Sequence, residues 1–255
     1  MKLGIIGCGA IGTDVAVYAD KMKEIERIYL MDVDKKAEKK LCKKLKKGEC
    51  KPLKDFLQEV DVVFEAASQK AVNEYAEMTL KEGKDLVLMS VGSLFDKKFK
   101  NKLEKLAMQK KCKIYLPSGA ICGIDGILSG SVDLIDEVTL VTTKSPKSLG
   151  KDFDRRSVIF RGSARDAVKE YPKNLNVAAS LSLAGIGFDK TRVEIVVDPV
   201  TTRNNHKILA HGSFGILRAE IENMPNPNNP KSSYMASLSA IATLKRIVNP
   251  IQIGA

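Results

Sequence analysis

The start of the chain joins a short apolar strand to a turn with three spaced glycines. The segment KLGIIGCGAIG spans residues 2–12 and carries glycines at positions 7, 9 and 12. Asp32 ends the next apolar run, roughly 20 residues further on, which is the spacing expected of a strand, a turn, a helix and a second parallel strand. This order restricts the first part of the chain to a parallel βαβ unit in an open α/β sheet.

Each glycine of the turn meets a different steric demand. Gly7 allows a tight connection from strand to helix, and Gly9 lets the backbone approach a pyrophosphate without an intervening Cβ. Gly12 allows the first helix to pack close to the sheet. Because the N–H groups at a helix start attract phosphate, we predict that Gly7, Gly9, Ala10, Ile11 and Gly12 bind a dinucleotide.

The acidic residue after the second strand bears on the kind of dinucleotide. We expect Asp32 to accept hydrogen bonds from an adenosine ribose. A carboxylate repels a 2′-phosphate, which favours NAD over NADP. Lys35 and Lys36 follow closely and could offset that repulsion. The predicted cofactor is therefore NAD or NADP, with the choice between them open.

The alternation of strands and helices continues to residue 117. Apolar runs that suit strands are separated by amphipathic stretches of helical length, as in repeated βαβ units. The predicted strands are 61–67, 85–90 and 113–117, and the predicted helices are 70–82 and 96–111. Together with the first two strands, these elements predict an N-terminal Rossmann domain with a doubly wound parallel sheet.

After residue 118 the pattern changes. A glycine-rich turn leads to strand-like segments at 138–143, 192–197 and 206–217, with a helix predicted over 176–184. This mixture is typical of an α+β domain with a mixed or antiparallel sheet, so the fold class is α/β with two domains.

The last quarter of the chain contains a proline-rich connector and a helix. Three prolines in 223–230 argue against regular structure there, whereas the apolar spacing of 232–248 predicts a helix that returns to the Rossmann domain. The predicted domains are 1–117 with 232–255 for dinucleotide binding, and 118–231 for catalysis.

Composition excludes several classes of protein. The chain has 255 residues, of which 44% are hydrophobic and 29% are charged. No run approaches the roughly 20 apolar residues of a membrane span, and no apolar signal segment precedes the first strand. Five cysteines without C-x-x-C spacing indicate neither a disulfide framework nor a metal site. We expect a cytoplasmic protein that binds no membrane and no metal.

The formal net charge of +11 raises the question of nucleic-acid binding. The densest lysine run, 35–51, suits a solvated helix and loop, and it lacks interleaved aromatics and any DNA-reading motif. A positive field also attracts anionic cofactors and substrates. We therefore predict small-molecule partners and no nucleic acid.

Only two histidines occur, His206 and His211. Their odd separation places them on opposite faces of a strand, so at most one is expected to enter a site. His206 follows the polar segment 201–205, and an imidazole titrates near neutrality, which suits a proton acceptor beside a redox cofactor. His206 is the predicted catalytic residue.

Five motifs follow one another along the chain: the glycine turn at 7–12, the segment 116–126, the segment 171–179, the RNNH sequence at 203–206, and the NPKSS sequence at 229–233. In this order they resemble the motifs of the L-aspartate dehydrogenase family. The resemblance covers nearly the whole chain. It implies an oxidoreductase acting on a CH–NH2 group, which converts L-aspartate to iminoaspartate with NAD(P). Iminoaspartate then either hydrolyses to oxaloacetate and ammonia or feeds quinolinate and NAD biosynthesis. A homodimer, joined through the catalytic domain, is also implied.

The resemblance assigns roles to individual residues. It implies that His206 is catalytic and that Ala120 and Asn176 contact the cofactor. Asn176 begins a predicted helix, so it could instead, or in addition, serve as an N-terminal helix residue. The groups that hold the substrate carboxylates are less well defined, and the candidates are Ser118, Arg203, Lys173 and Lys231.

Two other functions remain open from sequence. One is a related two-domain dehydrogenase or reductase, similar to homoserine dehydrogenase or dihydrodipicolinate reductase, with the same first domain and another substrate. The other is a protein that senses NAD without turnover. The direction of the reaction, the dimer interface and the transfer of iminoaspartate to a second enzyme are not determined by the residues.

Overall fold

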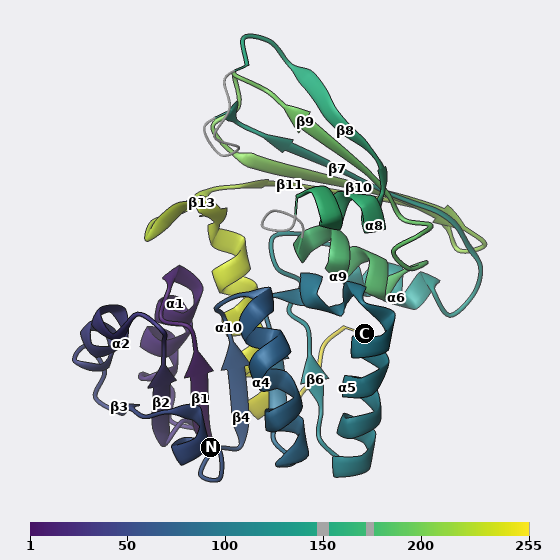
Figure 1. Cartoon of the computed structure of the whole chain (residues 1–255). Coiled ribbons are helices and arrows are strands. Elements are labelled where there is room, and N and C mark those ends of the chain that lie inside the picture. The colour runs from purple at the N-terminus through teal and green to yellow at the C-terminus, as the bar shows by residue number, and fades with distance from the viewer. Residues whose placement is uncertain (147–152, 172–175, 255) are drawn as a thin grey trace. The chain divides into compact units, whose positions relative to one another are not determined.

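The computed structural model describes residues 1–146, 153–171 and 176–254 (Figure 1). The chain divides into two compact units. The first comprises Met1–Pro117 and Ser237–Ile251, and the second comprises Ser118–Ala236 and Gln252–Ala255. Each unit is built around its own main β-sheet.

The sheet of the first unit has six parallel strands in the order β3-β2-β1-β4-β5-β6. This is the strand order of doubly wound dinucleotide-binding folds. The strands are β1 (Lys2–Ile6), β2 (Arg27–Met31), β3 (Gly48–Cys50), β4 (Val62–Glu65), β5 (Asp85–Leu88) and β6 (Ile114–Tyr115). The predicted Rossmann fold is confirmed.

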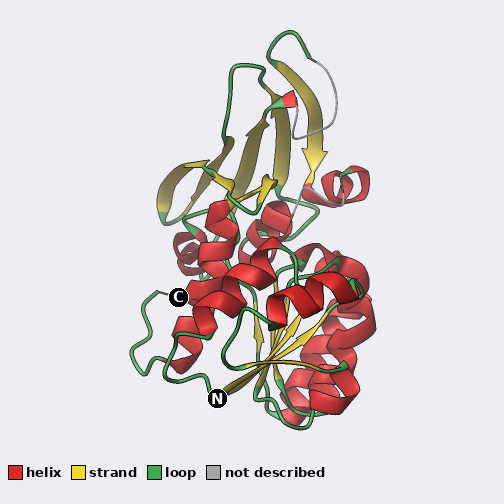
Figure 2. Ribbon diagram, turned by 90° about the vertical axis from the view of Figure 1, so that its left-hand side faces the viewer, coloured by secondary structure: helices red, strands yellow, loops and turns green. Residues whose placement is uncertain are grey.

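The central strands are apolar because helices cover both faces of this sheet (Figure 2). Every residue of β4 is buried, and so are the last four residues of β1 and of β2. The helices of the unit are α1 (Ala10–Ala19), α2 (Lys35–Cys42), α3 (Leu53–Phe56), α4 (Gln69–Lys81), the 3-10 helix η1 (Val91–Phe95), α5 (Lys97–Lys110) and most of α10 (Tyr234–Val248).

Side-chain caps explain where three of these helices begin. The carboxylate of Asp34 accepts hydrogen bonds at the start of α2, the hydroxyl of Ser68 does so for α4, and Asp96 does so for α5. The lysine-rich run 35–51 was expected to form only a helix and a loop, but it also contributes β3, which pairs in parallel with β2. An edge strand of three residues has too short a pattern to be predicted from alternation.

The main sheet of the second unit is mixed, with the order β11-β10-β7-β9-β8. Only β7 and β9 pair in parallel, and the other neighbours are antiparallel. The strands are β7 (Ile135–Lys144), β8 (Ser157–Ser163), β9 (Arg192–Val197), β10 (Asn204–Gly212) and β11 (Gly215–Asn223). The predicted mixed sheet of the second domain is confirmed.

Two expectations for this unit were wrong. The apolar run 206–217 forms two strands, because the chain reverses at Ser213–Phe214 and Gly215 takes a φ of +107° that favours glycine. The proline-rich connector forms a small hairpin of β12 (Pro225–Asn226) and β13 (Asn229–Ser233). Pro225 and Pro230 are tolerated because so short a ladder requires few backbone donors.

The two faces of the mixed sheet have different environments. Helices α6 (Ile124–Gly130), α8 (Ala164–Glu170) and α9 (Asn176–Ala184) lie along one face (Figure 1). The residues that point to this face, such as Leu140 on β7 and Ala210 on β10, are fully buried. On the other face Leu209 is 40% exposed. The covered face is therefore the core of the second unit.

The described helices include none that is both long enough and apolar enough to cross a membrane.

Candidate functional site

The glycine turn at the carboxyl end of β1 has the close contacts that its sequence predicts. A Cβ added at Gly7 would lie 2.7 Å from the carbonyl carbon of Ala66, and Gly7 has a φ of +101°. A Cβ at Gly12 would lie 1.9 Å from the carbonyl oxygen of Gly7. At Gly9 an added Cβ would meet nothing within 4 Å. The first and third glycines thus serve packing, whereas the second faces open space that a ligand can approach.

The start of α1 offers backbone donors beside this open space. Gly9 is the N-cap residue and has no side chain that could accept hydrogen bonds from the first N–H groups of the helix, which include those of Ala10 and Ile11. The first turn of α1 also contains no acidic residue. Free N–H groups and the positive end of the helix dipole suit a phosphate. The residues present therefore fit the pyrophosphate of a dinucleotide.

Asp32 is anchored to the glycine turn. Its carboxylate accepts hydrogen bonds from the backbone N–H of Cys8 at 2.5 Å and of Asp34 at 2.8 Å. The backbone N–H of Asp32 donates to Oε2 of Glu38 at 2.7 Å, and the Lys35 ammonium donates to the same oxygen at 2.7 Å. Glu38, a buried carboxylate that sequence reasoning missed, therefore fixes Asp32 and pairs with the charge of Lys35.

Glu65 is a second buried carboxylate that the sequence prediction missed. Its oxygens accept hydrogen bonds from the N–H groups of Ala67 and Ser68 and from both the N–H and the hydroxyl of Ser90. Burial nevertheless raises the pKa of Glu65 above its usual value, and these hydrogen bonds oppose the rise. Glu65 thus holds the loops after β4 and β5, and Ala66 in the first of these loops packs against Gly7.

The core face of the second unit ends in a group of polar residues. Along β7 and β10, the inward positions change from apolar to polar at the end of the sheet where β10 begins. The group, here called the polar cluster, contains Thr142, Lys144, Asn204, His206 and Asn223. All five are buried, with exposed fractions of 0%, 7%, 8%, 4% and 2% respectively.

Strand pairing brings the polar cluster together. His206 lies opposite Thr142 across the β10–β7 pair, and Asn204 lies opposite Asn223 across the β10–β11 pair. Lys144 follows Thr142 by two residues on β7, so its side chain projects from the same face of the sheet. Residues that are about 80 positions apart in sequence therefore share one buried surface.

His206 is held by Thr142, whose hydroxyl lies 3.0 Å from Nδ1 of the imidazole. Burial, and secondly the positive charge of Lys144, lower the pKa of His206 to about 3. The pKa lies below that of a free imidazole because the ring is buried in the core of the unit and not in the polar segment that precedes it. A neutral imidazole can accept a proton at neutral pH. His211 lies on the exposed side, 3.4 Å from Asp136.

Lys144 is the only cation of the polar cluster, and sequence reasoning missed it. Burial lowers its pKa to about 8. One signal was available: Lys144 is in phase with Val138, Leu140 and Thr142, which alternate along the buried face of β7. A lysine at such a position is unusual, because charged residues are rarely fully buried unless they have a role or a partner.

Asn223 links Ala120 to the start of β10. Its Nδ2 donates to the carbonyl oxygen of Ala120 at 3.0 Å and to that of Asn204 at 3.2 Å. Its Oδ1 is buried and has no hydrogen-bond partner among the residues that the structure describes. The side chain of Asn204 in turn donates to the hydroxyl of Ser233 at 3.3 Å. The predicted cofactor residue Ala120 is thus fixed next to the strand that carries His206.

The remaining predicted residues are not all joined to this cluster. Arg203 is exposed and its guanidinium pairs with Glu222 at 3.0 Å. Ser118 is half-buried, and Asn176 is exposed as the first residue of α9. Lys173 and the side chain of Lys231 lie outside the described residues. Within the described part of the chain, no group of three or more His, Cys, Asp or Glu residues could hold a metal ion.

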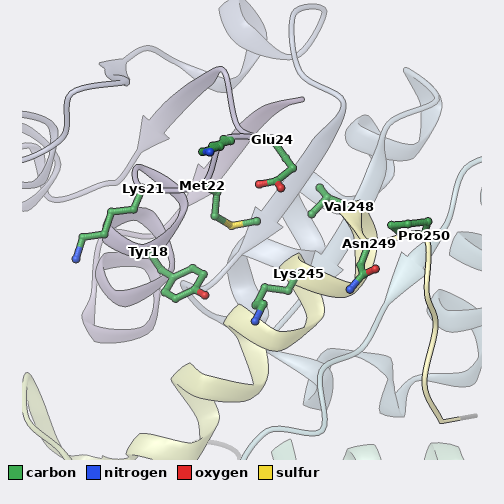
Figure 3. Close-up of a pocket in the computed structure, with 9 residues that line it drawn as sticks. Tyr18, Lys21, Met22, Glu24, Lys245, Val248, Asn249 and Pro250 are labelled. Atoms are coloured by element: carbon green, nitrogen blue, oxygen red, sulfur yellow. The ribbon is translucent and has the colours of Figure 1, made fainter.

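A separate surface cavity of about 650 Å³ lies at the far end of α1 from the glycine turn. Tyr18 from α1 and Lys245 from α10 extend into the space between the two helices, and Glu24 and Val248 lie nearby (Figure 3). The cavity is open and adjoins the carboxyl end of α1, whose dipole disfavours anions. It therefore does not match the phosphate site predicted from the glycine turn.

Two family models match the chain. The model described as "Aspartate dehydrogenase, C-terminal" covers residues 125–247. The model described as "Homoserine dehydrogenase, NAD binding domain" covers residues 7–117, which are almost all of the first unit up to Pro117. The two matches agree with a dinucleotide-binding sheet followed by a second domain that carries the polar cluster.

Relatives that match over the full length bear the name that the C-terminal family model also bears, aspartate dehydrogenase. The L-aspartate dehydrogenase of Methanosarcina barkeri is 43% identical over all of this chain and 99% of that protein. That of Methanococcoides burtonii is 44% identical with the same coverage. The crystal structure of aspartate dehydrogenase from Thermotoga maritima superposes with a TM-score of 0.81 at 29% identity, covering 100% of this chain and 99% of that one.

The comparisons confirm two predictions made from the motifs: the cofactor is NAD or NADP, and the protein is an oxidoreductase. With the nucleotide turn in one unit, the buried imidazole in the other and similarity over the full length, the chain belongs to the L-aspartate dehydrogenase family.

Proposed function

We propose that the protein oxidises L-aspartate to iminoaspartate with NAD or NADP. The observation that carries the proposal is the buried pair of His206 and Thr142, on a chain that is 43% identical over its full length to an L-aspartate dehydrogenase. Removal of a proton from a substrate amine requires a base, and a neutral, oriented imidazole can serve as that base.

In this proposal the first unit binds the cofactor. Gly7, Gly9, Ala10, Ile11 and Gly12 form the turn that holds the pyrophosphate, and the bound cofactor supplies a nicotinamide that accepts hydride from the substrate Cα. Asp32 accepts hydrogen bonds from the adenosine ribose. Since Glu38 already pairs with Lys35, less positive charge remains to offset Asp32, which supports a preference for NAD. Ala120 and Asn176 complete the cofactor contacts.

His206 is the general base of the proposal. In the tautomer that this role requires, Nδ1–H donates to the Thr142 hydroxyl and Nε2 carries the free lone pair, so Nε2 takes a proton from the substrate amine or from a water that attacks the imine. A pKa of about 3 makes a weak base, but a bound dicarboxylate adds negative charge, which stabilises the imidazolium and raises its pKa. The base thus gains strength when the substrate is present. Most of the rate acceleration would come from positioning the substrate.

The product has two proposed fates. Iminoaspartate either hydrolyses to oxaloacetate and ammonia or is passed on to quinolinate and NAD biosynthesis in the cytoplasm. Ser118, Lys173, Arg203 and Lys231 remain proposed substrate contacts, although the pairing of Arg203 with Glu222 weakens its candidacy.

We also propose a homodimer that forms through the uncovered face of the mixed sheet. A shallow groove of about 440 Å³ on this face is lined by Val141, Leu209 and Arg218 among others. The ion pair of Lys207 with Glu220, at 3.0 Å, borders the same groove. Mixed apolar and charged groups of both signs suit contact with a second copy of the same surface.

A substrate panel tests the proposed reaction. The purified protein is mixed with NAD or NADP and with L-aspartate, D-aspartate, L-glutamate or L-homoserine, and reduced cofactor is followed by its absorbance. The proposal predicts turnover of L-aspartate with a higher kcat/KM than the others. Turnover of L-homoserine alone would favour the related dehydrogenase. Cofactor binding without any turnover would favour a sensing protein.

A further inference from the structure

The segment 32–38, at the end of β2 and the start of α2, concentrates charge beside the glycine turn. Its sequence, DVDKKAE, contains three carboxylates and two lysines, Lys35 and Lys36. Glu38 is 5% exposed, whereas the side chain of Lys35 is 60% exposed. A buried carboxylate and an exposed lysine therefore meet next to Asp32, the residue proposed to bind the adenosine ribose.

One oxygen of Glu38 holds both of these neighbours. Its Oε2 accepts a hydrogen bond from the backbone N–H of Asp32 at 2.7 Å and from the ammonium of Lys35 at 2.7 Å. The N–H of Asp32 does not require a charged acceptor, because a neutral amide oxygen accepts the same hydrogen bond. A buried charge is unfavourable unless it is paired, and a second carboxylate beside Asp32 adds repulsion between like charges. What the charge of Glu38 adds is therefore the ion pair with Lys35.

The carboxylates outweigh the lysine in their effect on the glycine turn. Burial first, and then the negative charges of Asp32 and Glu38, raise the pKa of the Cys8 thiol to about 12. The positive charge of Lys35 acts in the opposite direction and more weakly. An additional anionic group brought to this part of the first unit is therefore repelled.

We infer that Glu38 is a positioning residue that sets the choice of cofactor, because its carboxylate holds the Lys35 ammonium in an ion pair and keeps it from a 2′-phosphate. The inference rests on the proposed dinucleotide site of the first unit and names the residue that makes this site select NAD. Glu38 acts through Lys35 and does not itself contact the cofactor. Asp32 repels the 2′-phosphate directly, and Glu38 prevents a lysine three residues further on from compensating that repulsion.

Lys36 is the alternative source of a compensating charge. It is exposed, and its backbone N–H donates at 2.9 Å to the carboxylate of Asp34, which caps α2. Residues three apart on a helix face each other, whereas residues two apart do not. Glu38 therefore pairs with Lys35, at 2.7 Å, and its position on the helix does not suit a pair with Lys36. Lys36 serves as the control cation.

The test measures the dissociation constants of NADH and NADPH by titration of cofactor fluorescence. We expect the wild type to bind NADH more tightly than NADPH. Glu38→Gln keeps an acceptor for the Asp32 N–H and removes the charge. It should tighten NADPH binding by about tenfold and leave NADH binding within about threefold of the wild type. Glu104→Gln is the matched control, because Glu104 also pairs with a lysine of its own helix, Lys100 of α5, at 2.6 Å. It should resemble the wild type for both cofactors.

A double-mutant cycle assigns the gain to Lys35. Adding Lys35→Met to Glu38→Gln should abolish the tighter binding of NADPH, whereas adding Lys36→Met should retain most of it. In the wild-type background, Lys35→Met should change the dissociation constant of NADPH by less than about threefold, since the ammonium is already paired. The same cycle with 2′,5′-ADP and 5′-AMP shows whether the effect belongs to the 2′-phosphate.

An unchanged ratio of the two dissociation constants in folded Glu38→Gln would overturn the inference, and so would a wild type that binds NADPH as tightly as NADH. If Glu38→Gln does not fold, Lys35→Met decides. A loss of NADPH affinity of about tenfold in the wild-type background would show that the ammonium already reaches the 2′-phosphate. Failure of the wild type to oxidise L-aspartate would refute the proposed reaction and leave these binding measurements valid.

Discussion

His206 is the residue on which the proposed chemistry depends. Its imidazole is buried, neutral and oriented by Thr142. Replacing it with alanine removes the base and leaves the glycine turn of the other unit unchanged. We therefore predict that His206→Ala lowers kcat for L-aspartate by about 10²- to 10⁴-fold, with the dissociation constant of NADH within about twofold of the wild type.

Steady-state kinetics and cofactor fluorescence check this prediction. His211→Ala is the control, because that imidazole is exposed beside Asp136 on the opposite face of the same strand. It should retain wild-type turnover. Wild-type kcat in His206→Ala would remove the imidazole from the mechanism.

The buried charge of Lys144 affects how the free energy of unfolding depends on pH. Its pKa is lowered from 10.5 to about 8, which corresponds to about 3 kcal/mol of destabilisation of the native state at neutral pH. Between these two values the unfolded chain binds more protons than the folded chain, so stability rises with pH in that window. Below pH 8 the penalty is present in full.

Removing the charge should therefore stabilise the protein. We predict that Lys144→Met raises the free energy of unfolding at pH 7 by about 1–3 kcal/mol. Urea unfolding of the variant and the wild type, without ligand, measures the difference. A loss of more than about 1 kcal/mol would show that the ammonium contributes favourable contacts that outweigh its desolvation.

At the scale of elements, the junction of β1 and α1 separates packing from binding. An added methyl at Gly9 meets no atom within 4 Å, whereas at Gly12 it would lie 1.9 Å from the Gly7 carbonyl oxygen. We predict that Gly9→Ala keeps the thermal midpoint and weakens NADH binding by about tenfold or more. Gly12→Ala should lower the free energy of unfolding by more than about 2 kcal/mol.

Thermal unfolding and NADH titration on both variants provide the measurement. The two positions serve as controls for one another, because the substitution is the same. Equal loss of stability at both glycines would mean that Gly9 has a packing role. Unchanged NADH affinity in Gly9→Ala would place the pyrophosphate elsewhere.

The predictability of the site also differs between elements. The glycine turn and Asp32 are predictable because turn, helix start and following strand are local in sequence. The polar cluster is not, because Lys144, His206 and Asn223 meet only through the order β11-β10-β7, which alternation patterns do not specify. Glu38 and Glu65 were missed for a different reason: nothing in the neighbouring sequence marks a carboxylate as buried.

Misjudged turns account for the errors in the second unit. The run 206–217 has continuous strand-like composition, so the reversal at Ser213–Phe214 between β10 and β11 was not recognised. Apart from its short edge strand β3, the doubly wound sheet of the first unit was predicted closely, because the periodicity of its buried strands and the capping of its helices agree.

At the scale of the whole molecule, the uncovered sheet face predicts self-association. We expect the 27.9 kDa chain to elute as a particle of twice that mass in size-exclusion chromatography with light scattering. Leu209→Lys places a charge on the 40% exposed apolar residue of that face and should yield monomers. The control Met108→Lys alters an 80% exposed residue of α5 and should stay dimeric. A monomeric wild type would contradict the proposed dimer.

The central claim is that hydride leaves the α-carbon of L-aspartate for the nicotinamide of a cofactor held by this chain. L-Aspartate deuterated at Cα, incubated with the protein and NAD, tests it directly by mass spectrometry of the reduced cofactor. The account predicts reduced cofactor that carries the deuterium, and a slower rate than with unlabelled aspartate. Reduced cofactor without deuterium, or none at all, would contradict it.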